Sequence, residues 1–387
     1  MRVLFVTLPA MGHFLPLVPL AAALRTHGHE VSFAASPLFA AEVEARGFTC
    51  HPAGRPWLQS DFPLYFPQLR ALGTGDVRTL WAYQNVFAGP PAAEVAADIV
   101  RIGASERFQL VVFESTQYAG CVAAETLGIP HVAVGVSSNS SDRRWVRLLA
   151  DQLSALREGA GLPPDPDMLM PFRYLFLSPV PSVLLGDADL PASYHEVRME
   201  SYDASSQALP RWLEELPERP TVYLTLGTVQ NKRPDAFRTV IDGLAGQNLN
   251  LVVTTGADQD PAVLGDLPEN TRAERFIAQG VLLPRCSAVV SHGGSGTLRA
   301  ALWFGLPGLL MPHTADQPRN AAICRDLGVA RTLEPAETTP DAVREAVAAI
   351  LHEPGYRESA LQVSRQMHRM PDVSEGVRLL EELVGQS

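Results

Sequence analysis

The sequence predicts an α/β protein built from two doubly wound, parallel-sheet domains. Its 387 residues exceed what one hydrophobic core usually spans. Short apolar, β-branched-rich runs alternate with segments of helical spacing in both halves, which is typical of β-α-β units. A Pro-rich stretch without such a pattern separates the halves. We therefore expect domains over residues 1–200 and 221–370, joined by a linker over 201–220.

The N-terminal half opens with a clear β-α-β-α-β succession. Residues 3–8 form a short apolar run typical of a buried strand, and residues 15–27 carry helical spacing up to a glycine. A second strand over 30–35, a helix over 37–46 and a third strand at "FTCH" follow. This order predicts a parallel sheet with helices on both faces.

The regular pattern then stops and resumes. Residues 54–91 are rich in Pro, Gly and aromatic side chains, and long irregular insertions of this kind usually carry function. A strand over 110–114, a helix over 117–127 and a strand over 131–136 come next. A second, polar-to-mixed segment over 137–181 follows and contains Trp145.

The C-terminal half repeats the alternation. Its expected strands are "TVYLTL", "NLVVTT", "TRAERF", "AVVSH" and "GLLMP". Its expected helices lie near 234–246, 281–286, 296–304, 317–327 and 340–353, followed by an amphipathic helix over 373–384. Both halves are therefore expected to be open α/β sheets, whose ligands bind beyond the carboxyl ends of the strands.

Composition excludes several classes of protein. The formal net charge of −11 argues against nucleic acid or an anionic membrane as the main partner. Four scattered cysteines form no CxxC pair, so neither a zinc site nor a disulfide framework is expected, and a reduced cytoplasm fits. Gly12, His13 and two prolines interrupt the apolar run over 3–24, which favours a strand–helix unit over a signal peptide.

The stretch "SHGGSGTLRAAL" places a histidine and three glycines between a strand and a helix. Glycine allows a ligand to approach the backbone closely. The free N–H groups of a first helical turn can hold phosphate oxygens, helped here by the Ser295 and Thr297 hydroxyls and by His292. A plain tight turn is the alternative for this stretch taken alone.

Neighbouring strand ends add polar groups. "MPHTADQPRNAA" sets Asp316 and Gln317 at a helix start, and a carboxylate beside an amide suits hydroxyl groups, although Asp316 could instead cap the helix. "RFIAQG" contributes Phe276 and Gln279 one strand earlier, and "LTLGT" ends another strand with Thr228.

Together, "RFIAQGVLLPRCSAVVSHGGSGT" and "GLPGLLMPHTADQPRNA" resemble the donor-binding signature of inverting GT-B glycosyltransferases of family 1. More narrowly, they resemble the bacterial group that glycosylates antibiotics and other natural products, and "AMGHFLPLVPLAAALRTHGHEV" fits the same group. The resemblance implies two Rossmann-like domains facing across a cleft, with a C-terminal helix within 371–387 packing back on the N-terminal domain. It also implies a nucleotide sugar as co-substrate, with TDP and a deoxysugar favoured and UDP left open, and neither another cofactor nor a metal.

The resemblance assigns a role to each matching position in the C-terminal half. Contacts with the diphosphate are implied for His292, Gly294, Ser295, Gly296 and Thr297, and Thr228 would face the phosphates. Phe276 and Ile277 would flank the nucleobase, Gln279 would lie near the ribose or base, and Asp316 and Gln317 would hold sugar hydroxyls. Many members carry Trp where this chain has Phe276.

His13, after the first strand, is the candidate general base. A histidine titrates near neutrality, so it can take a proton from an acceptor hydroxyl. Glu114, which ends the strand "LVVFE", is the candidate acid that orients it, in a position where the family usually has Asp. In the alternative interpretation His13 caps its helix and Glu114 is solvated.

The aromatic insertion fits an apolar acceptor, because such rings line binding clefts for apolar ligands. Ordinary packing of a long insertion is the alternative for each ring. The candidate acceptor residues are Trp57, Phe62, Tyr65, Phe66, Trp81, Phe87 and Trp145.

The expected activity is metal-independent, inverting transfer of a sugar to a small-molecule aglycone, with monomer or homodimer left open. A GT-B nucleotide-sugar epimerase and a non-catalytic sugar-nucleotide-binding partner of another transferase remain as alternatives. A nicotinamide oxidoreductase is disfavoured, because the first βαβ unit lacks a GxGxxG turn with a downstream acidic residue.

Overall fold

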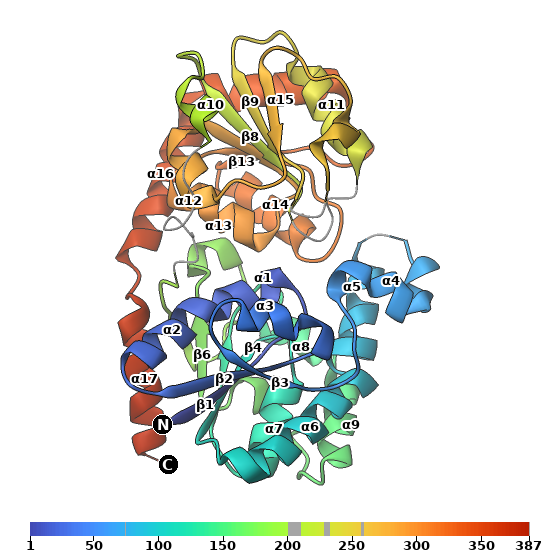
Figure 1. Ribbon diagram of the computed structural model, residues 1–387, viewed down its shortest axis with the longest axis vertical. Coiled ribbons are helices and arrows are strands. Elements are labelled where there is room, and N and C mark those ends of the chain that lie inside the picture. Colours follow the sequence, from blue (N-terminus) through green and yellow to red (C-terminus); the bar gives the residue numbers. More distant parts are fainter. Residues whose placement is uncertain (74, 200–209, 228–232, 257–258, 387) are drawn as a thin grey trace. The chain divides into compact units, whose positions relative to one another are not determined.

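A computed structural model describes residues 1–73, 75–199, 210–227, 233–256 and 259–386 (Figure 1). The chain divides into two compact units, Met1–Ser201 with Met370–Ser387 and Tyr202–Arg369. We call them unit 1 and unit 2. Each holds a parallel sheet, of seven and six strands respectively, so the predicted class of two parallel-sheet α/β domains is confirmed.

The sheet of unit 1 has the order β3-β2-β1-β4-β5-β6-β7, and all its recorded pairings are parallel. Its strands are β1 Arg2–Val6, β2 Glu30–Ala35, β3 Thr49–Pro52, β4 Leu110–Glu114, β5 His131–Val134, β6 Leu175–Ser178 and β7 Tyr194–Glu196. The order reverses between β1 and β4. In open α/β sheets this switch point is where loops diverge and leave room for a ligand.

Side chains alternate across this sheet and bury both faces. Val3 and Phe5 of β1 join one hydrophobic core, while Leu4 and Val6 join the other. The covering helices are α1 Met11–Phe14, α2 Val18–Thr26, α3 Ala40–Glu44, α6 Pro90–Glu106, α7 Ala119–Leu127, α8 Arg143–Arg147, α9 Ala150–Gly159 and α17 Val373–Gly385. Helix α17 lies beside α2, with Val377 and Leu380 buried in the unit 1 core (Figure 1).

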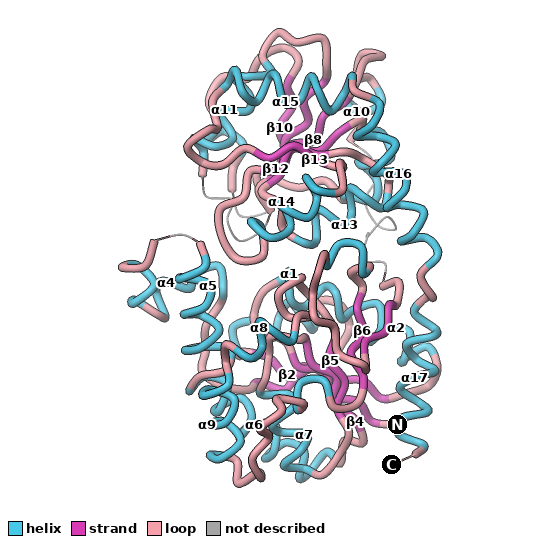
Figure 2. Tube along the Cα trace, turned by 180° about the vertical axis from the view of Figure 1, so that it is seen from behind, coloured by secondary structure: helices cyan, strands magenta, loops and turns pink. Residues whose placement is uncertain are grey.

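The insertion over 54–91 contains more helix than the sequence predicts. It forms α4 Phe62–Tyr65, α5 Asp76–Ala82 and a π-helical turn over Tyr83–Phe87, among shorter 3-10 turns. Figure 2 shows α4 and α5 as short separate helices at the margin of unit 1. Phe62 of α4 belongs to the core cluster that also covers β1 and β4, and Trp81 of α5 packs against it.

Unit 2 repeats the doubly wound plan with the order β10-β9-β8-β11-β12-β13. Its strands are β8 Thr221–Thr225, β9 Asn250–Thr254, β10 Thr271–Glu274, β11 Ala288–Ser291, β12 Gly308–Leu310 and β13 Ala330–Thr332. Its helices are α10 Arg211–Glu214, α11 Pro234–Leu244, α12 Gln279–Leu282, α13 Ser295–Trp303, α14 Gln317–Asp326, α15 Pro340–His352 and α16 Pro354–Arg369. Here the switch point lies between β8 and β11.

The linker between the two halves and the search for a membrane-spanning helix can each be compared with the structure. Within the expected linker over 201–220, residues 210–220 are described, and they contain the short helix α10. Over the described residues, no helix is both long enough and apolar enough to cross a membrane.

Candidate active site

The topology of unit 1 brings His13 and Glu114 together. Strands β1 and β4 are parallel neighbours with Val6 opposite Phe113, so the chain leaves both at the same edge of the sheet. His13 lies in α1, just beyond β1, and its Nδ1 is 3.3 Å from Oε2 of Glu114. The Glu114 side chain is fully buried and that of His13 is 18% exposed. Glu114 is therefore not solvated, and the N-cap of α1 is Ala10 rather than His13.

A third side chain completes this pair. Thr116 donates its backbone N–H to Glu114 Oε2 over 3.0 Å, and its hydroxyl lies 2.7 and 2.8 Å from the two carboxylate oxygens. The same hydroxyl oxygen lies 3.3 Å from His13 Nδ1. Sequence analysis missed Thr116. The feature that could have indicated it is a hydroxyl side chain two positions after the acid that ends the strand.

Four of the candidate acceptor rings form one continuous contact series that reaches His13. The Phe87 ring centroid is 6.3 Å from that of His13 and 6.0 Å from that of Phe62. Trp57 stacks on Phe62 at 5.2 Å, and Phe66 meets both edge-on. We call these four rings the aromatic wall. All four are buried in the unit 1 core, so the packing interpretation also holds for them.

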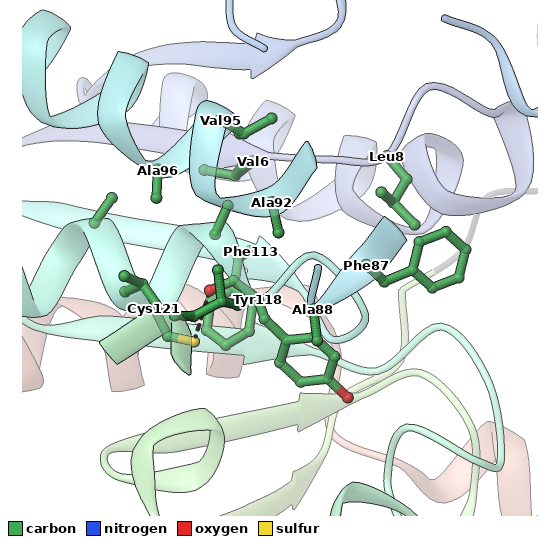
Figure 3. Packing of buried hydrophobic residues seen from close by; sticks show 14 of the residues in the cluster. Val6, Leu8, Phe87, Ala88, Ala92, Val95, Ala96, Phe113, Tyr118 and Cys121 are labelled. Carbon is green, nitrogen blue, oxygen red and sulfur yellow. Dashed lines mark hydrogen bonds between the residues drawn. The ribbon is translucent and has the colours of Figure 1, made fainter. Parts of the chain in front are cut away.

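The other three candidate rings lie differently. Trp145 contacts the series through Tyr83, which sequence analysis did not select, at centroid distances of 5.4 and 5.1 Å. Trp81 is partly buried against the same core, and Tyr65 is exposed. Figure 3 shows Phe87, Ala88 and Tyr118 within this core, with the hydrogen bond from the Cys121 thiol to the Tyr118 carbonyl drawn as a dashed line.

Glycines in unit 2 make room for the His292 imidazole. A Cβ at Gly227, after β8, would lie 2.6 Å from His292 Cε1, and a Cβ at Gly294 would lie 2.5 Å from Nε2. Gly227 also has a φ of +77°, which L side chains rarely adopt. His292 follows β11, the neighbour of β8, so the ring occupies the switch point of this sheet.

The helix after this loop presents free amides. Gly294 is the N-cap of α13, and the first helical hydrogen bond runs from the Leu298 N–H to the Gly294 carbonyl. The N–H groups of residues 295–297 therefore have no intrahelical partner, and the helix dipole favours an anion beside them by roughly 0.3–1 kcal/mol.

The side chains of Asp316 and Gln317 already accept hydrogen bonds from nearby groups of unit 2. Asp316 Oδ2 accepts hydrogen bonds from Ser295 Oγ at 2.5 Å and from Asn320 Nδ2 at 3.0 Å. Gln317 Oε1 accepts from the His313 and Thr314 N–H groups at 2.9 and 3.2 Å. Asp316 occupies the N-cap position of α14 without a side-chain capping bond.

These contacts define which atoms could meet a sugar or a phosphate. Asp316 keeps Oδ1 as an acceptor and Gln317 keeps Nε2 as a donor, whereas the Ser295 proton is directed to Asp316. Sequence analysis missed Asn320, whose amide ties Asp316 to the Gly293 carbonyl, 2.9 Å from its Nδ2.

The residues expected at the nucleobase differ in their exposure to solvent. Phe276 is 56% exposed, as a stacking platform requires, but the Ile277 side chain is 3% exposed and belongs to the hydrophobic core. Only the backbone of Ile277 could therefore reach a base. Gln279 Nε2 lies 3.4 Å from Thr297 Oγ1, next to the free amides. Thr228 falls outside the described residues.

Two imidazoles of unit 2 are held in their neutral form. Burial, and secondly the neighbouring His313, lower the pKa of His292 to about 4. Burial and Arg233 likewise lower the pKa of His313 to about 4. His292 Nδ1 and His313 Nε2 are buried without a hydrogen-bond partner among the described residues. Each ring at neutral pH still carries one N–H that can donate to a phosphate.

The lowered pKa values predict a loss of stability on acidification. Between pH 6.5 and 4 the unfolded chain protonates these histidines while the folded chain does not, so the free energy of unfolding falls as the pH falls. We expect His292→Asn/His313→Asn to lose less Tm than the parent between pH 6.5 and 4 in calorimetry. His27→Asn, at an exposed helix end, is the control. Equal Tm losses in parent and double variant would contradict this.

Metal centres are commonly built from grouped His, Cys, Asp and Glu side chains. Across the described residues, no cluster of three or more His, Cys, Asp or Glu could hold a metal ion.

Comparison with known proteins identifies the family of this chain. Residues 238–383 match the family model of the erythromycin biosynthesis protein CIII-like C-terminal domain. The 10-deoxymethynolide desosaminyltransferase of Streptomyces venezuelae is 30% identical over 424 residues, covering 100% of this chain and 98% of that protein. The elloramycin glycosyltransferase ElmGT of Streptomyces olivaceus is 32% identical, covering 96% and 94%. The crystal structure of glycosyltransferase VinC in complex with dTDP is 28% identical over all of both chains, with a TM-score of 0.82.

Two parallel-sheet units with functional groups at both switch points, together with these relatives, define an enzyme that transfers a sugar. The chain belongs to the antibiotic glycosyltransferases, family 1 enzymes with the GT-B fold. The predicted family is thereby confirmed.

Proposed function

We propose that this enzyme transfers a deoxysugar from a TDP carrier to a hydroxyl of an apolar natural-product aglycone, with inversion and with His13 as general base. The observation that carries the proposal is the His13–Glu114 pair. A partly exposed imidazole lies 3.3 Å from a fully buried carboxylate, beside the aromatic wall. The names of the relatives, a desosaminyltransferase and a structure with bound dTDP, support the donor class.

On the acceptor side, His13 takes the proton of the attacking hydroxyl. Glu114 accepts from Nδ1–H, which leaves the Nε2 lone pair for that proton, and the buried carboxylate stabilises the resulting imidazolium. The Phe87 ring borders His13, so the base has an apolar side chain beside it, which favours an apolar acceptor over a water molecule.

On the donor side, the free amides of 295–297 and the neutral His292 N–H meet the charge that develops on the leaving diphosphate. Asp316 Oδ1 and Gln317 Nε2 hold hydroxyls of the sugar. The acceptor oxygen attacks the anomeric carbon opposite the diphosphate, so the configuration inverts. This chemistry uses protein donors alone, and we propose neither a metal nor a further cofactor.

A turnover screen tests the proposal. TDP- and UDP-sugars are incubated with polyketide, macrolide and polyphenol aglycones, and the anomeric configuration of each product is read from NMR coupling constants. We expect transfer from TDP-sugars with inversion. Retention would overturn the inverting mechanism, and nucleotide release or epimerisation without an acceptor would favour the epimerase. Binding of TDP-sugar without any turnover would favour the non-catalytic binding partner.

The diphosphate position is tested by Gly296→Ala. Gly296 is exposed in the first turn of α13, and a Cβ there would have no heavy atom within 4 Å. Alanine favours helix over glycine by about 1 kcal/mol, so the fold should be kept. Because the methyl would stand over the free amides, we expect about tenfold weaker TDP binding in calorimetry, or ~1.4 kcal/mol.

Gly159→Ala is the control for this change, since Gly159 is the last residue of α9 and a Cβ there would likewise have no heavy atom within 4 Å. It should leave the TDP affinity unchanged. Unaltered TDP affinity in Gly296→Ala as well would place the diphosphate elsewhere.

A further inference from the structure

Thr116 contacts both members of the His13–Glu114 pair. It follows β4 by two residues and is 1% exposed, in a turn closed by the Gln117 N–H on the Glu114 carbonyl. The neighbouring Ser115 hydroxyl turns away and donates to Ser140 Oγ over 2.6 Å. For the residues that the structure describes, the recorded side-chain contacts of the Glu114 carboxylate are Thr116 and His13.

Counting protons assigns a direction to each of these contacts. The Thr116 hydroxyl has one proton, and its short distances of 2.7 and 2.8 Å to the Glu114 oxygens place that proton on the carboxylate side. Towards His13 the hydroxyl oxygen can then only accept. His13 Nδ1 thus faces two acceptors, Thr116 Oγ1 and Glu114 Oε2, each at 3.3 Å. Both favour a proton on Nδ1.

The Thr116 contacts restrain a side chain that is longer than the aspartate usual at this position. Glu114 has one more rotatable bond than an aspartate, and each free side-chain rotation costs entropy when it is fixed. Two donors from Thr116, the N–H at 3.0 Å and the hydroxyl, hold the carboxylate in one place without occupying its contact with His13. A threonine two residues after the acid therefore compensates for the extra methylene.

We propose that Thr116 is a positioning residue that holds Glu114 and selects the Nδ1–H tautomer of His13. The inference rests on the proposed role of His13 as general base, because only this tautomer offers a free Nε2 lone pair to the acceptor hydroxyl. Thr116 is 1% exposed and acts through Glu114 and His13.

The test combines a spectroscopic signature with kinetics. In protein labelled with ¹⁵N-histidine, the His13 ring signals are assigned by their loss in His13→Gln and report which nitrogen carries the proton. We expect Nδ1–H in the parent and in Thr116→Ser, and a mixture with Nε2–H in Thr116→Val. We also expect kcat to fall roughly tenfold in Thr116→Val, as for one lost hydrogen bond, with the donor KM unchanged.

Thr126→Val is the matched control, because Thr126 lies on the next helix and its hydroxyl donates only to the Val122 carbonyl, 2.8 Å away. It should keep the parent spectrum and kcat. If Thr116→Val does not fold, Thr116→Ala removes the same hydroxyl with less bulk. A parent-like His13 tautomer in the hydroxyl-free variant, or a Thr116→Ser variant as impaired as Thr116→Val, would overturn the inference.

The two readouts separate this inference from the proposed function. The tautomer measurement needs neither donor nor acceptor, so it stands even if no aglycone is glycosylated. Transfer activity that depends on His13 together with a tautomer that does not depend on Thr116 would overturn the inference and leave the proposed function intact.

Discussion

Replacing His13 with alanine is expected to lower kcat for transfer to an aliphatic hydroxyl by about 10³-fold, within the range of a lost general base. TDP affinity should stay unchanged, because His13 belongs to unit 1 and the free amides that would hold the diphosphate belong to unit 2. An aliphatic hydroxyl does not ionise at neutral pH and needs the base, whereas an acidic phenol needs it less. The loss in kcat should therefore be smaller for a nitrophenol acceptor.

A second histidine in the same unit controls for this substitution. His27 is exposed at the end of α2, and its Nδ1 contacts the Ala23 carbonyl at 2.8 Å. His27→Ala should transfer sugar at the parent rate. If His13→Ala also glycosylates the aliphatic acceptor at that rate, His13 is not the base.

Replacing Gly294 with alanine is expected to lower kcat/KM for the sugar donor by about 100-fold, the cost of a misplacement near 1 Å. The added Cβ would lie 2.5 Å from His292 Nε2, closer than atoms can approach, so the imidazole must move. The Gly227 side of the ring is equally tight, since a Cβ there would lie 2.6 Å from the ring. Initial rates at varied donor concentration measure the effect.

A double-mutant cycle shows whether Gly294 acts through the histidine. If the alanine methyl matters only because it displaces His292, then adding Gly294→Ala to His292→Ala should cost little more. Fully additive losses in kcat/KM would mean that Gly294 contributes to donor binding by another route, such as its own backbone.

The elements that sequence reasoning located well are those with strong local signals. The expected strands over 30–35 and 110–114 coincide with β2 and β4, since both are apolar runs with clear ends. Strands β7 and β13 were missed, because each has three mostly polar residues, whereas the three-residue strand β12 lies in an apolar run. Helix α16 was missed too, because it is largely polar and buries only a narrow stripe that includes Ala360, Val363 and Met367.

The candidate site divides in the same way. His13 and His292 could be found because parallel sheets gather strand ends at one edge, a rule that needs only the order of elements. The burial of Ile277, the partners of Gln317 and the contact of Thr116 depend on where side chains point, which the order of elements does not determine. The aromatic insertion has no regular period, so its buried and exposed rings could not be separated.

Helix α17 belongs to unit 1 but follows unit 2 in the sequence, so the ribosome synthesises it last. The Met1–Ser201 segment emerges first, yet the surface that receives Val377 and Leu380 stays uncovered until residues beyond 380 have been made. Unit 2 is a single continuous segment and can complete its core earlier. The half that carries His13 is therefore the last to be finished, in contrast to the usual order in which the N-terminal domain folds first.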